Sequence, residues 1–304
     1  MEALSGGVSS DIWRVELRSR PVCVKRALPR LRVAQLWEAP IERNRYERLW
    51  MQAAAAAAPG AAPKVIAWDD EGGLFAMEYL DYPVWKSLLR SGHADTAFAA
   101  QVGAALAAIH GATAAREDVK ATFATDAIFH AIRLEPYLVA TAKVHPDLRT
   151  RLAALEERTA KAKRCLVHGD VSPKNILVTP RGPVFLDAEC AWYGDPAFDV
   201  AFCLNHMFLK CVWVAQAQKG FLACYDALCA AYLPKVSWED ASAVEERAAT
   251  LLPGLLLGRI DGKSPVEYLD DAQRHTVRTI ARRLLLQPAK SLKALRAAWQ
   301  ESLT

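Results

Sequence analysis

Apolar and polar residues alternate near the start of the chain and then give way to a short apolar run. Residues 11–17 (DIWRVEL) follow a period of two, and residues 21–25 (PVCVK) come after a Ser-Arg-Pro turn. Alternation of this kind is typical of a half-buried strand, so the two segments predict a β-hairpin. Two further strands are expected over 65–68 and 74–80, because these apolar segments flank an acidic turn that contains two glycines.

Helical patterns occupy most of the remaining chain. From residue 39 the sequence is rich in helix-forming residues, including six consecutive alanines that stop before Pro59, which predicts one helix between the two strand pairs. Beyond Asp81, apolar residues recur at helical spacing in a segment expected to end at His110 and Gly111. Three short apolar segments interrupt the helices and are interpreted as buried strands with polar residues at their ends: 165–168, 175–178 and 184–187.

The composition fits a folded protein of one two-lobed unit or two modest domains. Of the 304 residues, 52% are hydrophobic, which is enough to form a substantial core. The 38 basic and 34 acidic residues are mixed along the chain, which indicates a solvated surface and no nucleic-acid partner. The seven cysteines include no Cys-x-x-Cys pair, which favours reduced core residues in a cytoplasmic protein. We recognise no secretory signal and no bilayer-spanning stretch, so no membrane partner is expected.

Three polar residues lie next to the predicted strands in an order that suits phosphoryl transfer. Asp170 precedes Asn175 by five positions within one loop, and Asp187 follows at the end of the next strand. Phosphoryl transfer requires groups that clamp the phosphates, oxygen ligands for magnesium and a carboxylate that orients the attacking hydroxyl. In the His-x-Asp-x-x-x-x-Asn arrangement, the Asp accepts the hydroxyl proton while the Asn and a later Asp hold the metal.

Three motifs in sequence order resemble those of a known family: His168-Gly-Asp-Val-Ser-Pro-Lys-Asn175, Asp187-Ala-Glu189 and Gly194-Asp-Pro-Ala-Phe-Asp-Val-Ala201. Together they resemble the aminoglycoside phosphotransferase and choline kinase-like family, over most of the chain and most weakly after about residue 215. The resemblance implies an α+β, protein-kinase-like bilobal fold. A nucleotide-binding lobe over 1–80, an antiparallel sheet with one main helix, would lead through a hinge near 77–81 to a larger, mostly helical catalytic and substrate-binding lobe over 81–304.

The resemblance also implies roles for the central residues. Asp170 would be the catalytic base or the group that orients the hydroxyl, and Asn175 and Asp187 would hold Mg²⁺, which favours hard oxygen donors. Glu189 is left open between a direct role and membership of a structural network. His168 is expected to form structural hydrogen bonds rather than to shuttle protons.

The nucleotide is expected to be ATP, although a preference for ATP over GTP is left open. Donors to its phosphates are expected from the turn before the first strand: Gly6, Gly7, Ser9 and Ser10. Lys25 ends the next strand, where a kinase lysine pairs with the α- and β-phosphates. Glu47 is the preferred partner of Lys25 on the following helix, although Glu42 lies nearly on the same face. The backbone groups of Glu78 and Leu80 are expected to read the adenine edge.

The acceptor is expected to be a hydroxyl group of a small molecule. Gly194-Asp-Pro196 follows Asp187 too closely to leave room for the activation segment of a protein kinase. The basic residues in this part of the chain suit a neutral or anionic alcohol, and four residues are expected to approach the acceptor: Asn205, His206, Arg259 and Asp261. The last two are expected on a polar turn over 258–265.

Two alternatives remain open. An aminoglycoside O-phosphotransferase, which confers antibiotic resistance, would need a carboxylate-lined pocket that the sequence of the second lobe does not indicate. A catalytically silent, nucleotide-binding pseudokinase would usually have lost a central residue, whereas Lys25, Asp170, Asn175 and Asp187 are all retained. The sequence is compatible with a monomer or a homodimer.

Overall fold

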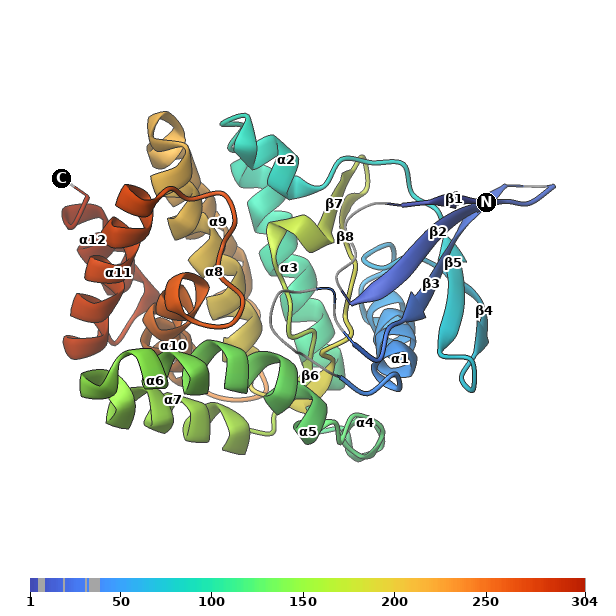
Figure 1. Cartoon of the computed structure of the whole chain (residues 1–304), viewed down its shortest axis with the longest axis horizontal. Helices are drawn as coiled ribbons and strands as arrows, with labels where there is room; N and C mark the ends of the chain where they lie inside the picture. The colour runs from blue at the N-terminus through green and yellow to red at the C-terminus, as the bar shows by residue number, and fades with distance from the viewer. Residues whose placement is uncertain (5–8, 19, 31, 33–38, 304) are drawn as a thin grey trace.

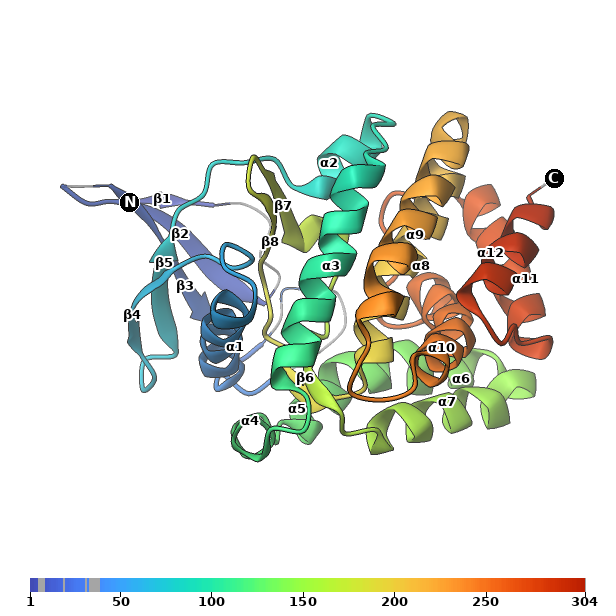
Figure 2. The same ribbon diagram turned by 180° about the vertical axis from the view of Figure 1, so that it is seen from behind.

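The computed structural model describes the chain except for residues 5–8, 19, 31, 33–38 and 304. A β-sheet with one helix forms one end of the molecule, and a larger group of helices forms the other (Figure 1). Two short two-stranded sheets lie between these parts, and the reverse view shows a long helix, α3 (Thr96–Thr113), passing beside them (Figure 2). The arrangement agrees with the predicted α+β, kinase-like fold.

The first sheet has five antiparallel strands in the order β1-β2-β3-β5-β4. They are β1 (Glu2–Ala3), β2 (Ser10–Glu16), β3 (Pro21–Ala27), β4 (Val65–Asp69) and β5 (Leu74–Glu78). Both predicted strand pairs are confirmed, because β2 pairs with β3 and β4 pairs with β5. Lys25 lies in the middle strand, opposite Ile12 on one side and Phe75 on the other. The sheet therefore holds Lys25 between two fully paired neighbours.

A single helix, α1 (Arg43–Ala57), packs against this sheet, as predicted. Its buried residues include Trp50 and Met51, and the helix lies against β5, where Phe75 is also buried. The helix ends before Pro59, which lacks the backbone N–H that a helix needs. Burial of this apolar face fixes the angle at which α1 crosses the sheet, and so fixes where its polar residues lie.

The second lobe contains most of the helices. Besides α3, it contains the following helices: α2 (Trp85–Arg90), α4 (Glu117–Thr122), α5 (Asp126–Phe129), the π-helix η1 (His130–Val139), α6 (Ala140–Val144), α7 (Arg149–Lys161), α8 (Pro196–Trp213), α9 (Gln218–Tyr232), α10 (Ala241–Asp261), α11 (Asp271–Leu286) and α12 (Leu292–Glu301). Four 3₁₀ turns complete the set: η2 (Pro146–Leu148), η3 (Pro173–Asn175), η4 (Ala215–Ala217) and η5 (Leu233–Lys235). The core lies around α8, in which every residue from 196 to 211 is buried.

Two predicted helix ends were placed too early. The helix α3 continues past His110 and Gly111 to Thr113, whose hydroxyl donates to the Ile109 carbonyl at 2.8 Å. The helix α10 continues through Gly258 and Arg259, so the polar turn starts only after Asp261. A Cβ at Gly258 would lie 2.5 Å from the Tyr137 carbonyl oxygen. Gly258 therefore lets α10 approach η1 closely and does not end the helix.

The short strands of the second lobe match the three predicted segments to within two residues. They are β6 (Cys165–Val167), β7 (Ile176–Thr179) and β8 (Gly182–Phe185), and β7 pairs with β8. The sequence analysis did not predict β9 (Trp192–Gly194), which pairs with β6. In the described part of the chain no single helix meets the length and hydropathy criteria for crossing a membrane, although α8 and the segment Ala215–Lys235 meet them as a bent pair.

Candidate active site

The loop between β6 and η3 is fixed by close packing at Gly169 and by hydrogen bonds to Asp199. Gly169 has a φ of 79°, and a Cβ there would lie 2.7 Å from the Cys190 Cβ. Any other residue at position 169 would therefore be strained and would clash. On the opposite side, the Asp199 carboxylate of α8 accepts from the amides of His168 at 2.7 Å and Gly169 at 2.8 Å. The loop is thereby fixed to the central helix of the lobe.

His168 acts as a brace within this loop, in agreement with the expectation of structural hydrogen bonds. Its Nδ1 lies 3.1 Å from the Asp170 amide, and its Nε2 lies 3.1 Å from the Leu186 carbonyl oxygen. The amide can only donate and the carbonyl can only accept, so the ring carries its proton on Nε2. Burial lowers the pKa of His168 despite the nearby acids, which keeps the ring neutral.

Asp170 lies between two cations. Its Oδ2 is 2.9 Å from an Nη of Arg133 and 3.5 Å from Nζ of Lys174. Burial alone would raise the pKa of Asp170, but Lys174 and Arg133 outweigh that effect and lower it. The carboxylate is therefore ionised at neutral pH and can accept a hydrogen bond from a hydroxyl group.

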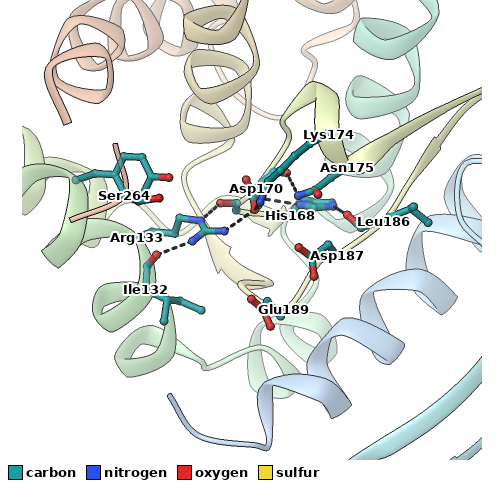
Figure 3. Close-up of polar contacts among 12 residues, drawn as sticks. Ile132, Arg133, His168, Asp170, Lys174, Asn175, Leu186, Asp187, Glu189 and Ser264 are labelled. Atoms are coloured by element: carbon teal, nitrogen blue, oxygen red, sulfur yellow. Dashed lines mark hydrogen bonds and ion pairs between the residues drawn. The ribbon is translucent and has the colours of Figure 1, made fainter. Parts of the chain in front are cut away.

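The sequence analysis missed Arg133 and Lys174. Arg133 reaches the loop from η1, and its Nε also donates to the Gly169 carbonyl at 2.5 Å (Figure 3). Nothing in the local sequence of η1 indicates this contact. Lys174 offered a signal, because it stands four residues after Asp170 inside the recognised motif.

Asn175 and Asp187 both lie in the part of the site that contains Asp170 (Figure 3). The Asn175 Nδ2 donates to the Asp170 carbonyl at 3.2 Å, and this contact leaves its oxygen as the side-chain atom for a ligand. Asp187 has a φ of 65°, a left-handed conformation that is uncommon outside glycine and often marks functional sites. Burial opposes ionisation of Asp187, but Lys25 and Lys174 hold its pKa below the ordinary value.

Lys25 and Glu47 form the predicted pair. The Lys25 Nζ is 2.8 Å from one Glu47 carboxylate oxygen and 2.5 Å from Asp187 Oδ1. Glu42, the other candidate, is exposed at the start of α1. Burial opposes the charge on Lys25, but Asp187 and Glu47 raise its pKa, so the ammonium stays charged. Two carboxylates from different elements thus hold one lysine.

Arg43 is a second functional candidate that the sequence did not reveal. This buried arginine lies 3.0 Å from a Glu189 carboxylate oxygen and donates to the Ser9 carbonyl at 2.5 Å and the Leu28 carbonyl at 2.7 Å. Glu189 is therefore part of a network that joins the second lobe to the first. Of the two readings that the sequence left open for Glu189, the contacts favour the structural network.

The other predicted nucleotide-binding residues are distributed around the first lobe. Ser9 lines the cavity next to Asp170, and Ser10 is buried at the start of β2. Gly6 and Gly7 lie outside the described residues. Glu78 and Leu80 border a separate cavity of about 500 Å³ behind α1 and the β7–β8 turn, and the Glu78 amide already donates to the Lys64 carbonyl at 2.8 Å.

The central cavity has a volume of about 90 Å³. Its walls combine the loop and metal-binding candidates with residues of η1, α8 and α10: Ser9, Ala39, Arg43, Ile132, Arg133, Tyr137, Asp170, Lys174, Asp187, Glu189, Phe202, His206, Arg259 and Ser264. Two of the four predicted acceptor residues, His206 and Arg259, line this cavity. They approach it from the side opposite to α1.

The other two predicted acceptor residues do not line the cavity, which corrects the prediction. Asp261 instead binds Arg278 with two contacts of 2.7 Å and His145 at 2.8 Å. Because α10 is still helical there, Asp261 points about 200° away from Arg259. Asn205 is fully buried, and its Nδ2 donates to the Phe202 carbonyl at 2.5 Å. Adjacent residues of an α-helix are rotated by about 100° from each other, so Asn205 does not share the face of α8 that carries His206.

Comparison with known proteins gives both sequence relatives and structural neighbours. Methylthioribose kinase 2 of Oryza sativa subsp. japonica is 24% identical over 219 residues, covering 61% of this chain and 51% of the relative. The chain thus spans about half the length of the curated relatives it matches. The amicoumacin kinase hAmiN, solved with AMP-PNP, Ca²⁺ and Ami, has a TM-score of 0.54 at 13% identity, covering 94% of this chain and 88% of its own.

A choline/ethanolamine kinase family protein from Mesorhizobium loti has a TM-score of 0.53 at 16% identity, covering 97% of this chain and 92% of its own. At these identities the two structures show a common fold. The model of the phosphotransferase enzyme family matches residues 1–231. That match covers 231 of the 304 residues and includes all three motifs and the Lys25–Glu47 pair. The chain therefore belongs to the phosphotransferase enzyme family.

Proposed function

We propose that this protein is an ATP-dependent kinase that transfers the γ-phosphoryl group to a hydroxyl group of a small molecule. The observation that carries the proposal is that Asp170 and Asp187 line one cavity, while Lys25 reaches it through its ion pair with Asp187. Each of the three groups is charged and is held by an oppositely charged partner. Phosphoryl transfer depends on positioning and charge stabilisation, and these three groups supply both. The kinase names of the sequence relatives support the same reaction class.

Asn175 and Asp187 are the proposed ligands of Mg²⁺. An amide oxygen and a carboxylate are hard donors, as this ion requires, and Mg²⁺ usually takes its remaining ligands from substrate phosphates and water. The described residues include no group of three or more His, Cys, Asp or Glu side chains that would hold a metal alone, which fits a site completed by the nucleotide. The bound ion would neutralise charge that develops on the phosphates.

Lys25 is proposed to bind the α- and β-phosphates of ATP. Glu47 would hold its ammonium in place when Asp187 engages the metal, because Glu47 lies on the other side of Nζ. Donors from Ser9, Ser10 and the turn before them are proposed to contact the phosphates, and the backbone of Glu78 and Leu80 is proposed to contact adenine. The lobes would then be residues 1–80 and 81–304, with the nucleotide between them.

Asp170 is proposed to orient the acceptor hydroxyl and to receive its proton. Its lowered pKa makes it a weak base before the reaction. In a loose, dissociative transition state the hydroxyl loses its proton late, so orientation matters more than basicity. Arg133 keeps the carboxylate ionised and fixes its direction through two contacts, one to Asp170 and one to the Gly169 carbonyl.

A small acceptor is favoured over a protein. Only eight residues, 188–195, separate Asp187 from the start of α8, so no peptide-docking segment fits there.

All seven cysteines lie among the described residues and are free thiols, which supports the proposed reducing, cytoplasmic location.

The test is acceptor-dependent release of ADP from MgATP, measured for a panel of hydroxylated compounds that includes sugars, hydroxy acids, choline and aminoglycosides. We expect Asp170→Asn to bind MgATP normally and to reduce turnover by about 10²–10⁴-fold. Asp118→Asn, at an exposed ion pair on α4, is the matched control and should retain full activity. Turnover that survives Asp170→Asn would contradict the catalytic assignment, and MgATP binding without any turnover across the panel would favour the pseudokinase alternative.

A further inference from the structure

The side of the central cavity formed by α8 and α10 contains a cation without a carboxylate partner. Arg259 donates through Nη1 to the Ser264 carbonyl at 2.5 Å, the Ser264 hydroxyl at 2.9 Å and the Tyr137 hydroxyl at 3.2 Å. No described carboxylate forms an ion pair with it, and its buried Nε has no hydrogen-bond partner. Among the described residues, no carboxylate therefore lies within ion-pairing distance of Arg259.

The other cations that line the cavity differ from Arg259 in this respect. Arg43 pairs with Glu189, and both Arg133 and Lys174 pair with Asp170. The acids of the cavity are thus all used by cations near the loop or by Lys25. Among the described cations that line the cavity, Arg259 is the one without such a pair, and it lies on the α8–α10 side, which faces the position proposed for the acceptor.

His206 and Lys210 add two further groups to this side. His206 is 95% buried, lines the cavity, and has an Nε2 without a partner. One helical turn later, the Lys210 ammonium lies 3.6 Å from the ring centroid of Tyr268, whose hydroxyl also lacks a partner. Among the described residues, Lys210 has no ion pair with a carboxylate, and only 1% of it is exposed.

Unpaired polar groups of this kind are costly. A buried donor without a partner destabilises the fold, and a buried charge without a counter-charge destabilises it more. Burial lowers the pKa of Lys210 to about 6, with Lys86 and Arg259 adding to the effect. An anion in the cavity beside Arg259 and His206 would give the Arg259 guanidinium a counter-charge and would favour the charged form of Lys210 behind them. A cationic acceptor would meet repulsion there.

We propose that the acceptor carries an anionic group, a carboxylate or a phosphate ester, which binds at Arg259 and His206 with Lys210 behind them, while its hydroxyl lies at Asp170. This inference rests on the kinase function proposed above. In the reaction, the hydroxyl oxygen forms a bond to the γ-phosphorus and the bond from that phosphorus to the β–γ bridging oxygen breaks. The hydroxyl proton passes to Asp170, and the products are ADP and a phosphate monoester that keeps the original anionic group.

A bland interpretation of Arg259 is that it only fixes the turn after α10, through Ser264. That role uses Nη1 alone and requires no cavity-facing histidine and no buried lysine. It also leaves Nε of Arg259 and Nε2 of His206 without partners. An anion would supply the counter-charge that Arg259 lacks within ion-pairing distance, and the two interpretations differ in what Arg259→Met does to the preference for a charged ligand.

The first experiment measures binding, so that it does not depend on turnover. Protein saturated with MgADP is titrated with D-glycerate, D-gluconate and glycerol 3-phosphate, and with their neutral counterparts glycerol and D-glucitol, by calorimetry. We expect each anionic compound to bind at least about 30-fold more tightly than its neutral counterpart, a ratio typical of a buried charge contact. Comparison of the two carboxylates with the phosphate ester shows which kind of anionic group the site prefers.

Variants then locate the anion. Arg259→Met and Lys210→Met should reduce the preference for the anion by about tenfold or more, while MgADP affinity stays unchanged. Lys263→Met, at a partly exposed pair with Glu135, is the matched control and should keep the preference. An anion preference that persists in Arg259→Met but disappears in Lys25→Met would place the anion in the nucleotide site and would overturn the proposal.

The second experiment measures ADP release with the same compound pairs. Higher kcat/KM for the anionic member, reduced by Arg259→Met, is the expected result. A preference for choline, an aminoglycoside or a neutral alcohol would overturn the anion proposal but leave the kinase proposal intact. Anion binding that depends on Arg259, without ADP release from any compound and without an effect of Asp170→Asn, would instead support the anion site and contradict the kinase.

Discussion

Arg133 contacts Asp170 at 2.9 Å from a different element of the fold, the π-helix η1. The wider turn of a π-helix is often found at functional sites, and here η1 also contains Pro136. The guanidinium contacts the loop twice, through the Asp170 carboxylate and the Gly169 carbonyl. The charge state and the direction of Asp170 thus depend on a residue outside the recognised motif.

Replacement of Arg133 by methionine tests this dependence. Because the Arg133 cation lowers the pKa of Asp170, its loss should raise that pKa. On acidification, activity should then begin to fall at a higher pH than in the unaltered protein. We expect kcat/KM to fall by about tenfold or more at pH 7, with the acid limb of the pH–rate profile moved toward neutrality. Both quantities follow from ADP release measured between pH 5 and 9.

Arg116→Met provides the comparison for this prediction. Arg116 forms an exposed pair with Asp118, and solvent screens such pairs, so they contribute little to stability. Its profile should match that of the unaltered protein. An Arg133→Met variant that folds and has an unshifted acid limb would refute the proposed influence of Arg133 on Asp170.

Glu47→Gln tests the pairing of Lys25. The amide cannot balance the ammonium, so Lys25 should bind Asp187 more strongly and compete with the metal. We therefore expect the affinity for MgATP to fall by about tenfold, whereas the fold should persist because Asp187 still contacts Lys25. Calorimetric titration with MgATP measures the affinity.

Glu42→Gln is the control on the same helix. Glu42 is exposed and does not pair with Lys25, so its replacement should leave MgATP affinity within about twofold of the original. Equal effects of the two substitutions would show that the general charge of α1, and not the Glu47 contact, determines nucleotide binding.

Lys210 should make the stability of the protein depend on pH in an unusual direction. Burial lowers its pKa in the folded state to about 6, from an ordinary value of 10.5. Between these values the unfolded chain binds the proton and the folded chain does not, so this group's contribution to stability rises with pH. The groups around it are Lys86, Arg259, Glu267 and the Tyr268 ring.

Lys210→Met should therefore raise Tm, and the gain should be largest near pH 6 and shrink toward pH 9. Thermal denaturation of both proteins across this range measures the difference. Lys263→Met should give a small and nearly constant difference, because Lys263 is partly exposed and paired. A gain from Lys210→Met that does not change with pH would argue against an uncharged lysine at this position.

The sequence predicted the parts of the fold and the site that depend on local patterns. Alternation identified β2 and β3, and the ordered motifs identified the loop that contains Asp170. The short apolar run before Lys25 identified the strand that carries it, and Glu47 was preferred over Glu42 as its partner. The packing of α1 confirms Glu47. The sequence alone left Glu42 open, because two acidic residues nearly on one face do not specify the rotation of a helix.

Long-range contacts explain what the sequence did not predict. In sequence, Arg43 and Arg133 look like any other helical arginine. Their roles depend on partners more than 30 residues away, which are Glu189 for Arg43 and Asp170 for Arg133. Glycine also misled the prediction at position 258, where it allows close packing against Tyr137. For the same reason, Asp261 was expected on a turn together with Arg259 and instead lies on the opposite face of α10.

The origin of the cavity walls has a consequence for how this protein could diversify. Asp170, Asn175 and Asp187 lie within the part of the chain that the family model matches, whereas Arg259 and Ser264 lie beyond residue 231. The reaction chemistry and one wall of the acceptor side are thus encoded in separate stretches that meet only after folding. Under the proposed function, substitutions in α10 would change which alcohol is accepted and would leave the phosphate-binding residues as they are.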